Sequence, residues 1–415
     1  MNQLRIAIVS FQYYKRNLRL LPWRYVYEFS QQFLNLGHEV TIVTDGYPEF
    51  VKEDPIGGVP VIHLSHVKHF PPRNFKSIKK TITEIDPHVV LWQMGFTNFF
   101  QKRLYETLSY PIIALISSSI YWRREIIERL KLSEINSERN LLSTSLAETF
   151  LPKILTRSTL NSDAIKSVVS MSQENTERLK KIGVKHQKLV YIPPGIDSNF
   201  FKNPSDEEIR KNRIAAIGEA GGFLVLYLGP PLLTRGVDTL LKAIDFALDT
   251  YPHLKRRLHV LFLLRIRKGE YSVQERNVLK LFDRLKHKEV VSVKSGFLSG
   301  SEIRPYMAAS DLIVFPFKHV ISDFPLGVVE AMSMGKTVVC TRIDGMSELL
   351  EQGRGFLVNP GDFVNIGRIL AHLPENKAEL NEYGRRSRQY MLERPTWTQS
   401  SERLLELLSD VLKTH

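Results

Sequence analysis

The chain has 415 residues, of which 43% are hydrophobic, and its formal net charge is +13. A chain of this length and composition can bury two substantial cores, and it is neither disordered nor fibrous. The positive charge predicts affinity for something anionic, and no apolar run approaches the ~18 residues of a membrane span. The amino terminus reads as a strand and not as a signal peptide, and the single cysteine, Cys340, excludes a disulfide framework. We therefore expect a cytoplasmic protein with two globular domains.

Short apolar runs alternate with amphipathic segments through the first half of the chain. The runs predicted as strands are 4–10, 40–44, 59–64, 89–92, 112–116, 165–170 and 189–192. The segments predicted as helices are 25–36, 76–85 and 173–182, and the polar stretch 125–160 is expected to be mostly helical. Alternation at this spacing predicts a parallel sheet covered on both faces.

A break in this pattern divides the chain. The sequence Pro-Pro-Gly-Ile-Asp at 193–197 interrupts regular structure and begins a polar segment that continues to about residue 220. We therefore predict an N-terminal domain of residues 1–198 and a C-terminal domain of residues 199–395. The second domain repeats the alternation, with strands expected at 223–228, 258–264, 290–293, 311–316 and 337–340 and helices at 237–248, 362–373, 377–393 and 399–412.

The stretch 322–339 carries the strongest local signals. Pro325 fits the first helical position, where its missing N–H would have no partner, and Gly335 fits the end of a short helix over 326–334. A buried strand follows at 337–340. Together with the apolar run before it, the stretch predicts a strand–loop–helix–strand unit, whose loop lies where α/β sheets bind ligands.

The beginning of this helix is a candidate anion site. The amides of Leu326 and Gly327 open the helix and carry the positive end of its dipole. Glu330 lies about one turn into the helix, so an anion with hydroxyls beside it, such as a nucleotide sugar, would suit the pair. The alternative is an ordinary helix in which Glu330 points to solvent.

A second candidate anion site is the loop 229–236, which follows one strand and leads into a helix. Arg235 at its end suits charge-assisted contacts with a diphosphate, although an arginine in water at a helix start fits the same pattern. A dinucleotide-binding Gly-x-Gly-x-x-Gly turn after a strand is absent, which is evidence against a dehydrogenase.

Taken together, these motifs resemble the retaining GT-B glycosyltransferases that carry two glutamates eight positions apart, the family 4-like enzymes of glycosyl transferases group 1. The resemblance rests on 192–197, Gly229 with 235–241, 306–316, 324–339, and Gly345 with Glu348 and Gly355. It implies an α/β fold of two Rossmann-like domains whose parallel sheets face a central cleft. It also implies that the last segment, 396–415, forms a helix that crosses back onto the N-terminal domain.

The resemblance implies a role for each matched residue. Glu330 would hold the ribose hydroxyls of a nucleotide-diphosphate sugar, and Arg235 would replace the family lysine that clamps the diphosphate. The implied donor-binding residues are Arg235, Gly229, Leu326, Gly327 and Glu330. Such enzymes mainly stabilise the charge of the leaving group, so neither a divalent metal nor another cofactor is expected.

The chain departs from the family pattern at three places. The first glutamate of the pair falls on Ser322, with Asp323 beside it, so the catalytic candidates are Glu330, Asp323 and Ser322. Pro230 replaces an arginine and cannot donate a hydrogen bond, and Ser117 stands where a histidine is usual. These departures keep open the alternative of a catalytically degenerate subunit or sugar-nucleotide-binding protein. A phosphorylase or epimerase on the same fold is a third reading.

The expected function is transfer of a sugar, with retention, to a lipid-linked, glycan or polysaccharide acceptor. Basic and aromatic residues cluster at 13–24, 66–80 and 121–124, a mixture that favours contact with an anionic membrane surface. We therefore expect peripheral contact with the cytoplasmic face of a membrane. No nucleic-acid-binding module is visible, so no nucleic-acid partner is expected.

Overall fold

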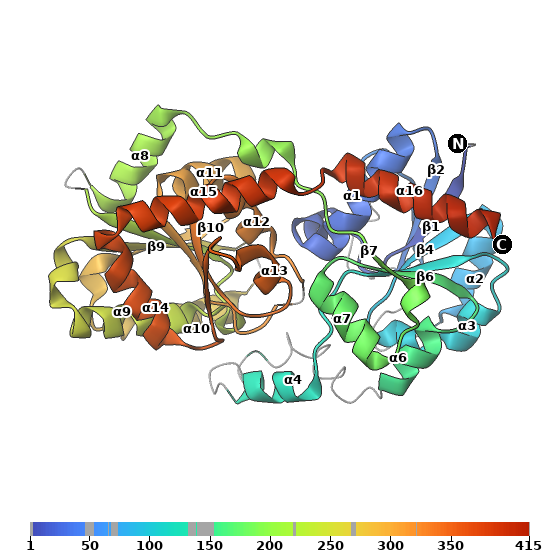
Figure 1. The fold of residues 1–415 in the computed structure, drawn as a ribbon, viewed down its shortest axis with the longest axis horizontal. Helices are drawn as coiled ribbons and strands as arrows, with labels where there is room; N and C mark the ends of the chain where they lie inside the picture. The colour runs from blue at the N-terminus through green and yellow to red at the C-terminus, as the bar shows by residue number, and fades with distance from the viewer. Residues whose placement is uncertain are drawn as a thin grey trace.

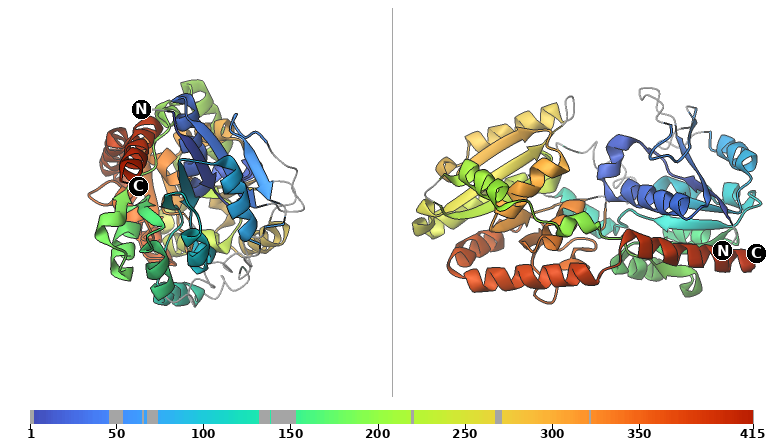
Figure 2. Two further views of the ribbon diagram at one scale, coloured as in Figure 1. Left: turned by 90° about the vertical axis from the view of Figure 1, so that its right-hand side faces the viewer. Right: turned by 90° about the horizontal axis from the view of Figure 1, so that it is seen from above.

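The computed structural model describes residues 3–45, 54–64, 66–67, 74–131, 138, 153–218, 221–266, 271–320 and 322–414. Two parallel sheets lie in two lobes placed side by side, and the view from above shows the same elongated arrangement (Figures 1 and 2). In the described ranges, no helix is long and apolar enough to cross a membrane.

The first lobe holds a seven-stranded sheet in the order β3-β2-β1-β4-β5-β6-β7, with every neighbouring pair parallel. Its strands are β1 (Arg5–Val9), β2 (Glu39–Asp45), β3 (Val61–Leu64), β4 (Val89–Gln93), β5 (Ile112–Ile116), β6 (Ile165–Ser170) and β7 (Leu189–Tyr191). Its helices are α1 (Leu21–Asn35), α2 (Lys76–Ile85), α3 (Lys102–Glu106), α4 (Arg123–Leu130), α6 (Lys153–Leu160) and α7 (Gln173–Ile182). All strands of this lobe match predicted runs, because strands buried on both faces are continuously apolar.

The second lobe holds a six-stranded parallel sheet in the order β10-β9-β8-β11-β12-β13. Its strands are β8 (Phe223–Gly229), β9 (Leu258–Arg265), β10 (Val291–Gly296), β11 (Leu312–Phe315), β12 (Thr337–Thr341) and β13 (Phe356–Val358). Its helices are α8 (Asp206–Ile217), α9 (Val237–Thr250), α10 (Ser272–Asp283), α11 (Gly300–Ala309), α12 (Leu326–Ser333), α13 (Met346–Leu350), α14 (Phe363–His372) and α15 (Lys377–Glu393). The fold class predicted from the sequence, two Rossmann-like halves, is confirmed.

One helix was not predicted, one local prediction needs correction, and one is tested only at its ends. The polar segment expected up to about residue 220 contains the helix α8, which buries only Ile217 and therefore lacks an apolar stripe, although Ser205 and Glu208 form a capping box at its start. Pro325 is the N-cap residue of α12 instead of its first helical residue, because its ψ of 123° is extended. Helices α4 and α6 occupy the ends of the stretch 125–160, and its middle lies outside the described residues except for Glu138.

The chain crosses between the lobes twice, and the two crossings lie against each other. Ile196 donates its N–H to Pro395 O at 2.9 Å, and a Cβ added to Gly195 would lie 2.2 Å from the Trp397 nitrogen. The final helix, α16 (Trp397–Lys413), then packs against α1 of the first lobe (Figures 1 and 2). The close approach of the Trp397 backbone leaves no space for a side chain at position 195, so glycine is required there.

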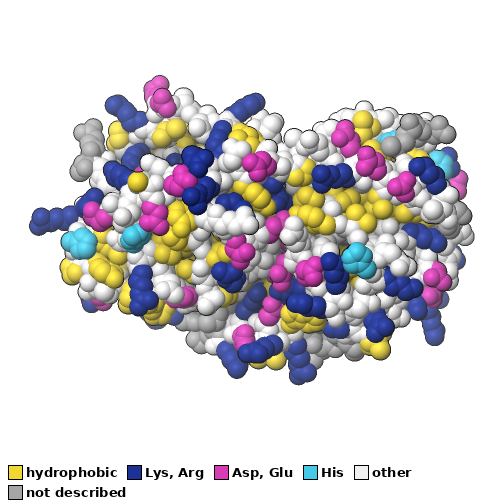
Figure 3. Space-filling model, in the orientation of Figure 1, with side chains coloured by type: hydrophobic (Ala, Val, Ile, Leu, Met, Phe, Trp, Pro, Cys, Tyr) yellow, Lys and Arg dark blue, Asp and Glu magenta, His cyan; other side chains and the backbone are white. Residues whose placement is uncertain are grey.

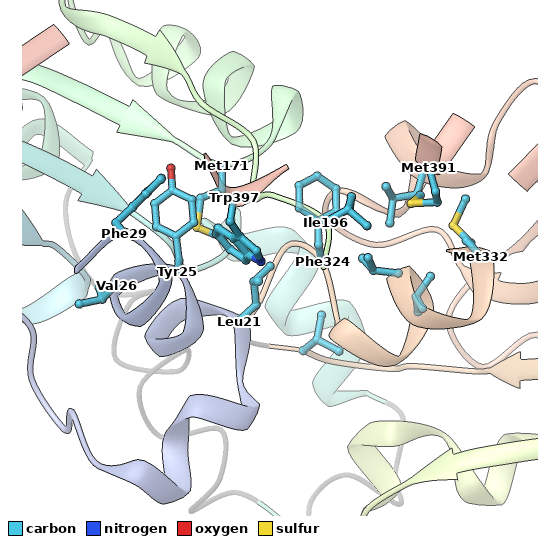
Figure 4. Packing of buried hydrophobic residues seen from close by; sticks show 14 of the residues in the cluster. Leu21, Tyr25, Val26, Phe29, Met171, Ile196, Phe324, Met332, Met391 and Trp397 are labelled. Atoms are coloured by element: carbon cyan, nitrogen blue, oxygen red, sulfur yellow. The ribbon is translucent and has the colours of Figure 1, made fainter. Parts of the chain in front are cut away.

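A continuous apolar cluster fills the space around these crossings. Trp397 makes edge-to-face contacts with Tyr25 and Phe29, with ring centroids 6.1 Å apart in both cases. Figure 4 shows Trp397 beside Tyr25 and Met171, with Phe324 in the same cluster on the side of the second lobe. The lobes therefore share a core at the crossover.

Candidate functional site

The site predicted from the sequence lies at the switch point of the second sheet. Strand β8 pairs with β9 on one side and with β11 on the other, so the loops after β8 and β11 leave the sheet next to each other. The amides of Lys318 and His319 both donate to Thr234 O at 2.9 Å. Gly236 has φ +79°, and a Cβ there would lie 1.7 Å from Pro316 O, so the loops meet at a distance that only glycine permits.

Arg235 lies in this junction and forms no ion pair with a residue that the structure describes. Its guanidinium carbon is 5.5 Å from the centre of the Phe317 ring, and it makes no hydrogen bond or ion pair with a described residue. Burial lowers the pKa of Arg235 from its usual value. The charge of Glu138 acts on Arg235 without forming an ion pair, so an anionic ligand would offset the remaining cost of burying the cation.

The start of α12 provides unpaired amides. Pro325 supplies no side-chain hydrogen bond to the helix, and the first amides of a helix have no acceptor within it. The N–H groups of Leu326 and Gly327 therefore remain available to a ligand. A Cβ on Gly327 would lie 3.3 Å from the Phe315 ring, so the residue also allows the helix to approach β11 closely. Gly229, the last residue of β8, lies at the opposite side of the junction.

Glu330 projects from the first turn of α12 and is only partly exposed. Burial raises the pKa of Glu330 to about 7, while Arg304 and Arg265 oppose this rise and Asp197 adds to it. Its carboxylate makes no hydrogen bond with any residue that the structure describes. A buried acceptor of this kind is suited to hydroxyl donors from a ligand.

One carboxylate already binds part of the loop after β8, and no local sequence pattern predicts it. Glu138, which belongs to the first lobe, is 3% exposed. It accepts hydrogen bonds from the amides of Leu233 at 2.5 Å and Thr234 at 3.0 Å. The loop amides therefore bind an anionic group within the chain itself.

Asp323 differs from Glu330, because its oxygens are fully engaged. Its Oδ1 accepts from Ser119 Oγ at 3.0 Å, and its Oδ2 accepts from Ser172 Oγ at 2.6 Å and Asn175 Nδ2 at 2.7 Å. All three donors belong to the first lobe. Burial, followed by the charge of Asp344, raises the pKa of Asp323 to about 7. The neighbouring Ser322 has a buried Oγ without a hydrogen-bond partner.

Two further acids extend this contact between the lobes. Asp344 accepts a hydrogen bond from the Tyr121 hydroxyl at 2.6 Å, and burial raises the pKa of Asp344 to about 6. Glu348 accepts from the amide of Gln173 at 2.9 Å and from the Tyr191 hydroxyl at 2.5 Å. The partners are more than 150 residues apart in sequence, so local patterns carry no information about them.

The two remaining departures from the family pattern are also placed. Ser117 is fully buried after β5, where its Oγ accepts from Gln93 Nε2 at 2.6 Å. The Pro230 carbonyl accepts from the Tyr227 hydroxyl at 3.1 Å. Across the described ranges, no three His, Cys, Asp or Glu residues are grouped so that they could hold a metal ion.

Comparison with known proteins agrees with this geometry. Residues 23–200 match the family model for Glycosyltransferase Family 4, and residues 231–376 match the one for Glycosyl transferases group 1. Among solved structures, a glycosyltransferase from Rickettsia africae has a TM-score of 0.75 at 16% identity, and each chain is covered completely. HepE from Anabaena, solved in complex with UDP and glucose, has a TM-score of 0.71 at 16% identity, with 98% of this chain and 100% of that chain covered. The fold is therefore GT-B.

Curated relatives match over part or most of the chain. A D-inositol 3-phosphate glycosyltransferase from Pseudarthrobacter chlorophenolicus is 27% identical over 198 residues, covering 47% of this chain and 44% of that protein. A mannosylfructose-phosphate synthase from Agrobacterium fabrum is 25% identical over 411 residues, covering 92% of this chain and 85% of that protein. The chain thus spans less than half the length of the first relative and most of the second. With its family 4 domain and its group 1 domain, the chain belongs to the GT-B glycosyltransferases.

Proposed function

We propose that this protein transfers a sugar from a nucleotide-diphosphate sugar to an acceptor hydroxyl, with retention at the anomeric carbon. One observation carries the proposal: the segments that follow the adjacent strands β8 and β11 hold a guanidinium without an ion pair, two open amides and a carboxylate without a hydrogen bond among the described residues. A nucleotide-diphosphate sugar offers the complementary groups, because its diphosphate is anionic and its ribose donates hydrogen bonds. The glycosyltransferase relatives, and the structural neighbour HepE solved with UDP and glucose and with UDP-glucose, support this choice of donor.

The donor would be held from both sides. Arg235 and the amides of Leu326 and Gly327 face the diphosphate, and Glu330 accepts from the ribose hydroxyls. Gly229 leaves room for the nucleotide at the end of β8. No metal or other cofactor is needed in this scheme, because the arginine and the helix amides offset the negative charge.

The reaction breaks the bond between the anomeric carbon and the diphosphate oxygen and forms a bond from the same carbon to the acceptor oxygen. The acceptor proton passes to the departing diphosphate oxygen. Positive groups near that oxygen stabilise the charge that develops as the bond breaks. Ser322, whose buried hydroxyl lacks a partner, is the candidate contact to the donor sugar, and Asp323 remains the candidate acid beside it.

The proposed acceptor is a lipid-linked, glycan or polysaccharide hydroxyl reached at a membrane surface. Ile127 on α4 and Ile154 on α6 are 41% and 69% exposed, and Arg123 and Arg124 lie in the same region. Figure 3 shows Lys and Arg side chains along the lower edge, where Figure 1 places α4. Such a mixture of apolar and basic side chains suits the surface of an anionic bilayer.

The membrane proposal is tested by co-sedimentation with vesicles of phosphatidylglycerol and phosphatidylcholine. Binding is expected to require the anionic lipid, to weaken with salt and to fall in the pair Ile127→Ser with Ile154→Ser. A matched control, Val273→Ser on the exposed face of α10, should leave it unchanged. Binding that is unchanged by the lipid charge and by the two isoleucine substitutions would refute the proposal.

The donor proposal is tested by a thermal-shift screen of UDP-, GDP- and ADP-sugars, because a ligand that binds the folded state raises its melting temperature. One nucleotide sugar should stabilise the protein, and the shift should be lost in Arg235→Ala and Glu330→Ala. If both variants keep the thermal shift, the nucleotide sugar does not bind at this site. Product formation with an acceptor would exclude the alternative of a degenerate nucleotide-sugar-binding protein, which Pro230 and Ser322 motivate.

A further inference from the structure

A cavity lies at the end of the second sheet opposite to the proposed donor site. Its volume is about 360 Å³, and it is bounded by the start of β8, the segment before β9 and the start of α15. The proposed donor residues follow the ends of β8 and β11, so the sheet separates the two places. This cavity takes no part in the function proposed above.

Four cationic side chains and one carboxylate line the cavity: Arg213, Arg256, Arg257, Lys377 and Asp311. Arg213 is fixed, since it donates to Ala309 O at 2.6 Å and to Asp311 Oδ2 at 2.9 Å. Arg257 forms an ion pair with Glu375. The positive side chains therefore outnumber the acids even when Glu375 is included.

The remaining two cations have no partner among the residues that the structure describes. Neither Arg256 nor Lys377 makes a hydrogen bond or an ion pair with a described residue, and the same holds for the amide of Asn381. Like charges held around one space repel each other, and an anion between them converts that repulsion into attraction. Guanidinium and ammonium groups together are typical of phosphate recognition.

The size of the cavity and its apolar lining residues indicate a ligand larger than an inorganic ion. Its volume falls within the range of about 300–1,000 Å³ that is usual for small-molecule sites. The lining also contains three buried apolar side chains, those of Phe223, Pro374 and Leu380, which we take as its floor. A ligand with one anionic end and a compact body would place its charge on the rim and its body against this floor.

We propose that this cavity binds a phosphate monoester about the size of a hexose phosphate, held by Arg256 and Lys377 at the rim and by Arg213 and Arg257 behind them. A lipid with a phosphate monoester headgroup presents the same chemistry. A ligand bound here would contact the start of α15, the helix that leads directly into the crossover to α16.

The test is isothermal titration of the full chain with glucose 6-phosphate, and co-sedimentation with phosphatidic acid vesicles against phosphatidylcholine vesicles. The double variant Arg256→Glu with Lys377→Glu should weaken binding at least about tenfold. Both side chains are exposed, so the variant should fold. A matched reversal on α10, Arg276→Glu with Lys280→Glu, should leave binding unchanged, since these residues are equally exposed and lie outside the cavity.

The donor-site variant Arg235→Ala separates this proposal from the previous one, because it should retain the binding of glucose 6-phosphate. If the double variant at Arg256 and Lys377 weakens vesicle binding but not glucose 6-phosphate binding, the phosphate that binds in the cavity belongs to a lipid. Absence of binding to both probes would overturn the proposal. An equal loss in the α10 control would also overturn it, because net charge alone would then explain the binding.

Discussion

Glu330 and Asp323 lie seven residues apart, and burial raises the pKa of each to about 7, yet their surroundings differ. Asp323 accepts three hydrogen bonds from the first lobe, whereas Glu330 accepts none from a described residue. A buried acid that is fully bonded joins parts of the protein, while a buried acid that lacks donors is suited to receive them from a ligand. This difference supports the proposal that Asp323 joins the lobes and that Glu330 binds the donor.

The same contrast extends to the neighbouring charges. Among the described residues, Arg235 forms no ion pair and Glu330 receives no hydrogen bond on its carboxylate. Glu348, in contrast, accepts from Gln173, Tyr191 and Arg394. Arg235 and Glu330 at the switch point of the second sheet are therefore open to a ligand, whereas Asp323 and Glu348 are bonded where the lobes meet.

The largest expected effect is that of Arg235→Ala on donor binding. A hydrogen bond to a charged group contributes about 1.5–3 kcal/mol, so nucleotide affinity should fall by about ten- to a hundredfold. Stability should not fall, because the guanidinium has no ion pair to lose. Titration calorimetry and urea unfolding measure the two effects, and Arg276→Ala on α10 is the control. If stability falls and affinity does not, Arg235 has a structural role instead of a role in donor binding.

Asp323→Ala should show the reverse pattern. It leaves Ser119, Ser172 and Asn175 without their acceptor at a buried contact, which costs about 1–3 kcal/mol of unfolding free energy. The affinity for the nucleotide alone should stay close to that of the parent protein. A variant that unfolds at the same urea concentration as the parent would contradict the structural role.

The pH dependence of stability gives a smaller effect with a defined sign. Burial raises the pKa values of Asp323 to about 7 and of Asp344 to about 6, above the ordinary aspartate value of about 4, so the folded state binds protons more tightly than the unfolded chain. Their contribution to stability is complete below about pH 4 and is lost as the pH rises through 6 and 7. Asp323→Asn should flatten the urea midpoint between pH 5 and pH 8. An unchanged profile would show that Asp323 does not titrate there.

Donor affinity should change with pH in the opposite direction. Ribose hydroxyls donate to the ionised form of Glu330, so affinity should rise by a few-fold as the pH passes through about 7. Glu330→Gln should abolish this rise. If donor affinity still rises with pH in Glu330→Gln, another group is responsible for the pH dependence.

The sequence predicted the sheets and α12 well and the lobe contacts poorly. Continuous apolar runs identify strands that are buried on both faces, and the Pro325 and Gly335 signals bracket α12 closely. Helix α8 lacks an apolar stripe, so periodicity did not reveal it. The bonds of Asp323 join residues at least 148 positions apart, and such pairs leave no local pattern.

The residues of the candidate site could be named from the sequence, but whether they are paired within the chain could not be predicted. Arg235, Glu330 and the amides of Leu326 and Gly327 could be named from their positions after strands and at a helix start. Whether such groups are paired depends on the whole fold, as Glu138 shows by occupying the amides of Leu233 and Thr234. Only the structure separates Glu330 from Asp323.

The most direct test titrates one nucleotide into the parent protein, Glu330→Ala and Asp323→Ala, with the nucleotide chosen as the strongest stabiliser among UDP, GDP and ADP. Affinity should fall at least about tenfold in Glu330→Ala and remain near the parent value in Asp323→Ala. Loss of affinity in Asp323→Ala with retention in Glu330→Ala would contradict the assignment of the two acids.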